Sequence, residues 1–208
     1  MRHLLLLSAC YFIALGTSAL AVEAVLLQDI SISTRPGAPA PDGKAAYLRV
    51  SETDSAFLLF DFAAVLPEGT TADQMAKATL RLWTAGGRNG GACTAQMVSG
   101  LWSERKGGII APGPPPVIAP SPVAVGVLNQ QFLIIDVTSL VKEWLSGKQN
   151  WGMVIRGTTL AVVHDAGVPN VGLVSNNPIS PMNLYFDSKE NRLTGRLPTL
   201  QMVLRPGP

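Results

Sequence analysis

The chain is poor in the residues from which most catalytic and metal-binding sites are built. It has two cysteines, Cys10 and Cys93, and two histidines, His3 and His164, in 208 residues. Only one of each remains if the N-terminal segment is removed, which is too few for a zinc site or an internal disulfide bond. No Gly-x-Ser-x-Gly motif accompanies the histidine that remains. We therefore interpret Cys93 as a small buried thiol and predict that the protein is not an enzyme.

Charged residues are also scarce, at 14% of the chain, while hydrophobic residues make up 47%. Disordered proteins have the opposite composition, so the sequence predicts a folded protein. Lys and Arg total 16 against 14 Asp and Glu, and no basic stripe is visible. This balance argues against nucleic acid as a partner. No apolar run reaches the roughly 20 residues that a membrane-spanning helix needs, so we expect no span in the mature chain.

The first 21 residues have the three-part layout of a secretory signal. A short basic start, MRH, precedes the apolar stretch LLLLSACYFIALG, and an Ala-x-Ala pattern ends at Ala21. This layout predicts cleavage after Ala21 and a secreted, extracellular or periplasmic protein of residues 22–208. A secreted protein without disulfide bonds favours a bacterial origin. The segment LSAC, ending at Cys10, resembles a lipoprotein signal, but the apolar run continues past the cysteine, so lipidation is not predicted.

Short apolar runs separated by turn residues predict ten or so strands. In AKATLRLW, residues 76–83, apolar side chains alternate with Lys77, Thr79 and Arg81. SAFLLFDF is nearly all apolar and therefore reads as a central strand. The other strand-like runs are AVLLQDISIST, KAAYLRV, ACTAQMV, QFLIIDV, WGMVIRG, LAVVH, NLYFDS and PTLQMVLR. Together they predict an all-β fold, a jelly-roll-like sandwich formed by residues 22–208 as a single domain.

A proline-rich segment interrupts the strand pattern. Residues 111–122 hold six prolines in twelve positions, which no central strand tolerates. We expect an extended loop that crosses one end of the fold. The alternative is a polyproline ligand for a partner protein.

One short amphipathic helix is predicted at about residues 138–146. Apolar side chains recur there at helical spacing, at Val137, Leu140, Val141, Trp144 and Leu145. Thr138 or Ser139 can supply the N-cap oxygen, and Gly147 can end the helix. A helix of this length is unstable alone, so it must pack on the sheets, with Trp144 as the largest anchor. The alternative is a ligand-binding role for Trp144.

Several sequence motifs follow one another along the chain. They are Asp29 in LLQDISI, SAFLLFDF, KATLRLW, LWSE, DVTSLVKEWLSGKQNWGMVI and FDSKENRLTGRLPTLQMVL. In this order the chain resembles the DNRLRE domains, secreted β-sandwich domains grouped with a carbohydrate-binding module family (family 96). The resemblance covers essentially all of residues 22–208. It implies structural roles for Trp102, Glu104, Asp136, Trp144, Gly152 and Pro198.

The chain departs from the family pattern mainly in loops. Trp151 stands where a small polar residue is usual, and Arg105 and Lys106 lead into the proline-rich loop in place of a Thr-Trp-Asn segment. Residues 158–182 are longer than the family norm. Because these departures cluster in loops, they argue against a ligand site shared with the family more than against the shared fold.

The resemblance implies a non-catalytic carbohydrate- or cell-surface-binding module, with a polysaccharide or cell-envelope glycan as partner. Sugar binding uses an exposed aromatic ring with polar groups beside it. We interpret Trp83, Trp102 and Trp144 as core residues. Trp151 is then the candidate platform, with Arg156 or His164 nearby; the alternative is that Trp151 caps the sheet edge.

Two other classes of function remain open. A structural or adhesive cell-envelope component would engage an envelope protein through a sheet edge or the proline-rich loop. A polysaccharide-active enzyme would need two carboxylates across a bond, and Glu104 and Glu143 are candidates by elimination. We expect instead that Glu104 bonds backbone groups near the loop after Trp102 and that Glu143 lies on the solvent face of the helix.

No cofactor is expected from the sequence. A structural calcium ion is left open, because backbone carbonyls could complete a cage around scattered aspartates. These are Asp29, Asp54, Asp61, Asp136, Asp165 and Asp187.

Overall fold

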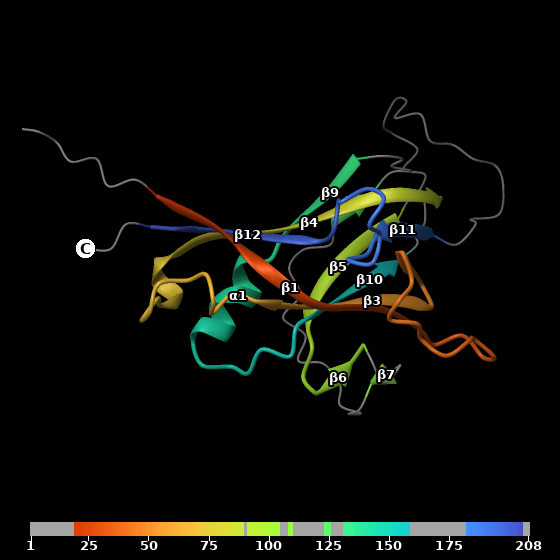
Figure 1. Cartoon of the computed structure of the whole chain (residues 1–208), viewed down its shortest axis with the longest axis horizontal. Coiled ribbons are helices and arrows are strands. Elements are labelled where there is room, and N and C mark those ends of the chain that lie inside the picture. The colour runs from red at the N-terminus through yellow and green to blue at the C-terminus, as the bar shows by residue number, and fades with distance from the viewer. Residues whose placement is uncertain are drawn as a thin grey trace, which may run out of the picture.

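A computed structural model of the protein describes residues 19–89, 91–104, 108–109, 123–125, 131–158 and 182–205. The described strands are β1 (Leu20–Ser33), β2 (Tyr47–Ser51), β3 (Asp54–Asp61), β4 (Met75–Arg88), β5 (Gly91–Met97), β6 (Trp102–Ser103), β7 (Gly108–Ile109), β8 (Val123–Val125), β9 (Gln131–Asp136), β10 (Met153–Thr158), β11 (Asn183–Asp187) and β12 (Thr199–Leu204). A 3-10 helix, η1 (Ala72–Gln74), and an α-helix, α1 (Thr138–Leu145), lie at the same end of the molecule (Figure 1).

Ten of these strands hydrogen-bond in the order β2-β11-β4-β12-β1-β3-β10-β5-β8, with β9 also paired to β4. β1 belongs to both layers of the fold, because Leu20–Ala24 pair with β12 and Val25–Ser33 pair with β3. A bulge between Leu26 and Gln28 separates the two parts. Since a bulge bends a strand and increases its twist, it lets β1 pass from one layer to the other.

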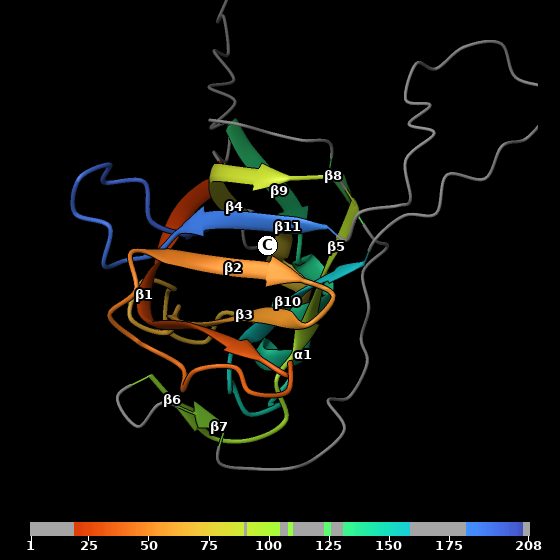
Figure 2. The ribbon, with the colours of Figure 1, turned by 90° about the vertical axis from the view of Figure 1, so that its right-hand side faces the viewer.

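The chain changes layer at every connection from β2 to β5 and again from β8 to β11. This interleaving is typical of jelly rolls. Figure 2 shows the two layers one above the other. The upper layer contains β9, β4, β11 and β2, and the lower layer contains β3 and β10. The predicted all-β sandwich with one short helix is therefore confirmed.

The core follows the period-two pattern of the strands. In β4, Leu80 and Leu82 are completely buried, while Lys77 and Arg81 lie on the outer face. β3 is paired on both sides, with β1 and β10, as its apolar sequence predicted. The largest fully buried side chains include Phe60, Phe186, Leu48, Leu58, Met75, Ile135, Leu140, Met153 and Ile155.

Helix α1 covers the main core, as its apolar stripe predicted. Trp144 is 6% exposed and stacks on Phe62, with ring centroids 5.7 Å apart. The N-terminus differs from the expectation, because Val137 is the N-cap residue and has no side-chain acceptor. Asp136 Oδ1 instead accepts hydrogen bonds from the Thr138 N–H at 2.9 Å and from Thr138 Oγ1 at 2.6 Å. An aspartate that bonds the backbone two residues on is a local turn device, and it replaces the predicted Thr or Ser cap.

Several expectations fall outside the described residues. They concern the signal up to residue 18 with Cys10, the proline-rich loop 111–122, and the run LAVVH with His164. The expected cleavage after Ala21 would fall within β1, leaving Val22 paired opposite Met202.

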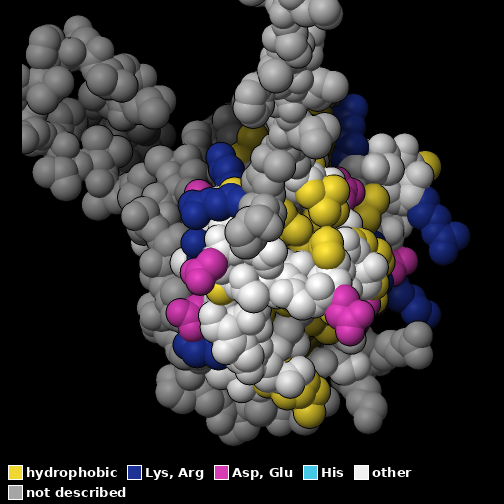
Figure 3. All heavy atoms as spheres, turned by 90° about the vertical axis from the view of Figure 1, so that its left-hand side faces the viewer, with side chains coloured by type: hydrophobic (Ala, Val, Ile, Leu, Met, Phe, Trp, Pro, Cys, Tyr) yellow, Lys and Arg dark blue, Asp and Glu magenta, His cyan; other side chains and the backbone are white. Residues whose placement is uncertain are grey.

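Neither helix of the described part is long and apolar enough to cross a membrane. On the end of the molecule that carries α1 and η1, basic and acidic side chains are interspersed around a small hydrophobic group (Figure 3).

Candidate functional site

The structure places the expected sugar-binding residues apart. Trp151 is half-buried just before β10, and its carbonyl accepts a hydrogen bond from the Trp102 indole N–H at 2.7 Å. Arg156 is exposed five residues further along an extended segment, which corresponds to about 16 Å. His164 lies outside the described residues. Trp151 and Arg156 therefore do not form one platform.

Trp102 and Gly152 have packing roles in the structure. Trp102 packs with Ile30, Phe57 and Val154 in a second cluster on the far side of the β3–β10 layer. Gly152 has φ +86°, and a Cβ atom there would lie 2.3 Å from the carbonyl oxygen of Leu58. Only glycine fits such a position.

Pro198 is buried just before β12, and Cys93 is buried in the main core. Burial raises the pKa of the Cys93 thiol to about 12. A thiol in this state is not a nucleophile, and the expectation of a small buried thiol is confirmed.

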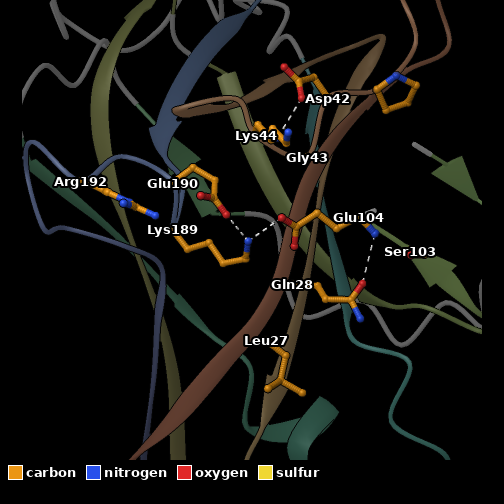
Figure 4. Close-up of a pocket in the computed structure, with 11 residues that line it drawn as sticks. Leu27, Gln28, Asp42, Gly43, Lys44, Ser103, Glu104, Lys189, Glu190 and Arg192 are labelled. Atoms are coloured by element: carbon orange, nitrogen blue, oxygen red, sulfur yellow. Dashed lines mark hydrogen bonds and ion pairs between the residues drawn. The ribbon is translucent and has the colours of Figure 1, made fainter. Parts of the chain in front are cut away.

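A hollow of about 1190 Å³ among the described residues is lined mainly by charged and polar side chains (Figure 4). At its base Lys189 lies between Glu104 and Glu190. The Lys189 ammonium donates to Glu104 Oε1 at 2.5 Å and to Glu190 Oε1, and it lies 3.8 Å from Asp29 Oδ1. We call these four residues, Asp29, Glu104, Lys189 and Glu190, the Lys189 cluster.

The Lys189 cluster joins segments that are distant in sequence. Glu104 Oε2 accepts the N–H of Asp29 at 3.3 Å, across 75 positions. Asp29 Oδ2 accepts the N–H of Lys189 at 2.7 Å, across 160 positions. Glu104 therefore does bond backbone, but on β1 and not near Trp102 as we expected.

The charges of the Lys189 cluster are unbalanced, since one ammonium faces three carboxylates. Burial would lower the pKa of Lys189, but hydrogen bonds to Glu104 and Glu190 outweigh it and raise the pKa above its ordinary value. Asp29 is 2% exposed, and its Oδ1 has no hydrogen-bond partner in the described part of the chain. Burial raises the pKa of Asp29 from 3.8 to about 6.

These contacts give the Lys189 cluster a structural role, because they link β1 to the segments that contain Glu104 and Lys189. The Lys189 ammonium lies between the carboxylates, where a metal ion would have to bind. No three Asp, Glu, His or Cys side chains among the described residues form a group that could hold a metal ion. The candidate carboxylates Glu104 and Glu143 do not face each other, because Glu143 lies on α1, pairs with Lys148 just after the helix and does not line the hollow.

A second set of side chains has the composition that sugar binding requires. Trp83 of β4 and Phe132 of β9 lie on the outer face of their sheet with ring centroids 4.9 Å apart, edge to face. The Arg196 guanidinium lies 3.8 Å from the centre of the Trp83 ring, and the Arg81 guanidinium 4.3 Å from that of Phe132. We call these four residues, Arg81, Trp83, Phe132 and Arg196, the aromatic–arginine face.

The aromatic–arginine face is partly accessible to a ligand. Arg81, Trp83 and Phe132 are half-buried and Arg196 is exposed. Neither arginine side chain forms an ion pair with another described residue. The interpretation of Trp83 as a core residue was therefore wrong. The signal was in the sequence, since Trp83 shares the odd-numbered positions of Lys77, Thr79 and Arg81, which point outward.

Comparison with known protein families and with curated proteins found no match for this chain.

Proposed function

We propose that this protein is a secreted, non-catalytic module that binds polysaccharide or a cell-envelope glycan through the aromatic–arginine face. The observation that carries the proposal is the pair of rings, Trp83 and Phe132, partly exposed on a sheet, with one arginine guanidinium stacked over each ring. The apolar face of a sugar ring packs well on an aromatic ring, and a flat sheet holds such rings in place.

The two guanidiniums favour acidic sugars over neutral ones. Each stacks on a ring and forms no ion pair within the described part of the chain, so its N–H groups remain available to a ligand. Arginine presents these donors as a fork that matches the geometry of a carboxylate. The sequence resemblance to carbohydrate-binding DNRLRE domains supports the same function.

A glycan array probed with residues 22–208 tests the proposal. We expect binding to at least one polysaccharide, and a loss of about tenfold in affinity for Trp83→Ala, the scale of one aromatic contact. Arg156→Ala is the matched control, because Arg156 is exposed on the other sheet and should have no effect.

The array also separates this site from the one expected from sequence. Loss of binding in Trp151→Ala but not in Trp83→Ala would move the site to Trp151. No binding to any glycan would contradict the function itself.

A structural or adhesive component that binds a protein is the second candidate function. Trp and Arg are the residues most enriched in protein interface hot spots. Ile134, 55% exposed, lies on the outer face beside Phe132, and β9 pairs only with β4 among the described strands. Capture of one envelope protein by the wild type but not by Trp83→Ala, with a blank glycan array, would favour this candidate.

A further inference from the structure

We propose a second sugar-binding site in a hollow of about 330 Å³ beside β2, which we call the tyrosine hollow. Tyr47 and Arg49 of β2 and Tyr185 of β11 line one side of it, and the loop of residues 35–46 lines the other. The inference rests on the glycan-binding function proposed above and adds a site that the aromatic–arginine face does not contain.

The two sites open on the same face of one sheet. Tyr47 and Arg49 alternate with the buried Leu48 and Val50, and Tyr185 pairs directly opposite Arg49. Outward-facing positions of β2, β11 and β4 therefore carry all these side chains. β2 and β4 are separated by β11, so Tyr47 lies two strand spacings, or about 10 Å, from Trp83.

Arg49 is fixed in place before any ligand binds. Its Nε lies 3.1 Å from Asn183 Oδ1 and 3.3 Å from Asp54 Oδ2, and its guanidinium is 6.0 Å from the centre of the Tyr185 ring. No other described residue accepts a hydrogen bond from its terminal nitrogens. Four N–H donors are therefore held ready at the hollow, and little entropy is lost when a ligand uses them.

Asp54 is the buried group that anchors Arg49. It is 4% exposed and accepts hydrogen bonds from Ser51 Oγ at 2.5 Å and Thr53 Oγ1 at 3.2 Å. Burial alone would raise the pKa of Asp54, but these bonds and the Arg49 charge outweigh it and hold the pKa below its ordinary value. Asp54 stays ionised near neutral pH and keeps Arg49 oriented.

The edge of β2 is not free to accept another strand. Ser31 Oγ accepts the N–H of Arg49 at 2.5 Å and lies 3.3 Å from the Arg49 carbonyl oxygen. Side-chain bonds of this kind satisfy the backbone where a partner strand would otherwise pair. The tyrosine hollow is therefore a site for a ligand held by side chains.

The chemistry of the tyrosine hollow matches a sugar ring. Tyr47 is 48% exposed and offers a ring face, Arg49 offers a donor fork and Asp42 an acceptor. Vicinal hydroxyls of a sugar both donate and accept, so they can use both kinds of group. The volume lies at the small end of ligand pockets, which suits one or two sugar rings. A polysaccharide that touches both sites would gain avidity.

Titration with sugars of one to six rings, uronates and neutral hexoses both included, tests the inference by NMR. The Arg49 Nε–H signal reports on the tyrosine hollow, and the Trp83 indole N–H signal, assigned with Trp83→Phe, reports on the aromatic–arginine face. We expect both signals to shift in the wild type. In Tyr47→Ala the Arg49 shift should disappear while the Trp83 shift persists. Tyr47→Phe, which keeps the ring, should retain at least a third of the wild-type affinity at the hollow.

The outcomes separate the two proposals. A Trp83 shift without an Arg49 shift, with Tyr47→Ala equal to the wild type, would overturn the second site and leave the proposed function standing. No shift of either signal with any sugar would overturn both. Because Tyr47 is exposed, Tyr47→Ala should fold, and an unchanged thermal midpoint verifies this.

Discussion

At the scale of single residues, burial decides which polar groups hold the fold and which can serve a ligand. Asp29 is buried in the Lys189 cluster with an unpartnered oxygen and a pKa raised to about 6, whereas Asp54 is pinned by hydroxyls and Arg49 with a lowered pKa. The guanidiniums of Arg81 and Arg196 lie over aromatic rings and form no ion pair with another described residue. At neutral pH the ionised Asp29 therefore destabilises the fold and the ionised Asp54 stabilises it, whereas the two arginines are available to bind.

Asp29→Asn should raise the free energy of unfolding at pH 7 and change its pH dependence. The pKa of Asp29 is about 6 in the folded state and 3.8 in the unfolded chain. The stability that Asp29 contributes is therefore fully present below pH 3.8 and is lost as the pH rises through 6. The neutral Asn avoids a loss of about 3 kcal/mol, and the advantage should shrink as pH falls from 7 to 4. Urea unfolding across this range measures the effect.

Asp54→Asn is the control of opposite sign. The folded-state pKa of Asp54 is lowered, so its contribution is present at neutral pH and is lost on acidification. This variant should be less stable than the wild type at pH 7, with a penalty that shrinks toward acid pH. If Asp29→Asn lowers the free energy of unfolding at pH 7, as Asp54→Asn should, then Asp29 is not a buried carboxylate that destabilises the fold when ionised.

At the scale of elements, the period of the apolar pattern was sufficient to predict the strands and α1. The helix was expected at about residues 138–146 and begins and ends at Thr138 and Leu145. Its cap was missed because the Asp136 side chain belongs to the preceding strand. The Lys189 cluster could not be predicted, because only the tertiary fold brings Asp29 of β1 and Lys189, which follows β11, together across 160 positions.

Trp144→Ala should destabilise the protein by about 3–5 kcal/mol, because it removes the largest side chain with which α1 contacts the core. Glu143→Ala, on the neighbouring position of α1, breaks only a surface pair with Lys148 and should cost less than about 1 kcal/mol. Urea unfolding compares the two variants. Equal losses would mean that α1 does not anchor through Trp144.

At the scale of the whole molecule, the two layers leave one sheet face with aromatic and arginine side chains while the other layer is covered in part by Trp102. Trp83, Phe132, Tyr47 and Tyr185 all lie on the first face. The sequence resemblance predicted a glycan-binding module, and Trp151 was chosen because the other tryptophans were interpreted as core residues. In the structure Trp151 contributes its carbonyl to the Trp102 hydrogen bond. Side chains alternate between the two faces of a strand, so the position of a residue in the alternation decides its face. For Trp83 the sequence already showed this, because it alternates in step with Lys77, Thr79 and Arg81.

Affinity electrophoresis of residues 22–208 in gels that contain polygalacturonate, alginate or neutral xylan decides whether the aromatic–arginine face binds acidic glycans. We expect retardation by an acidic polysaccharide that weakens with added salt, because Arg81 and Arg196 bind its carboxylates. Trp83→Ala should weaken this retardation by about tenfold in affinity. Retardation that is equal in wild type and Trp83→Ala, or absent from every gel, would contradict this expectation.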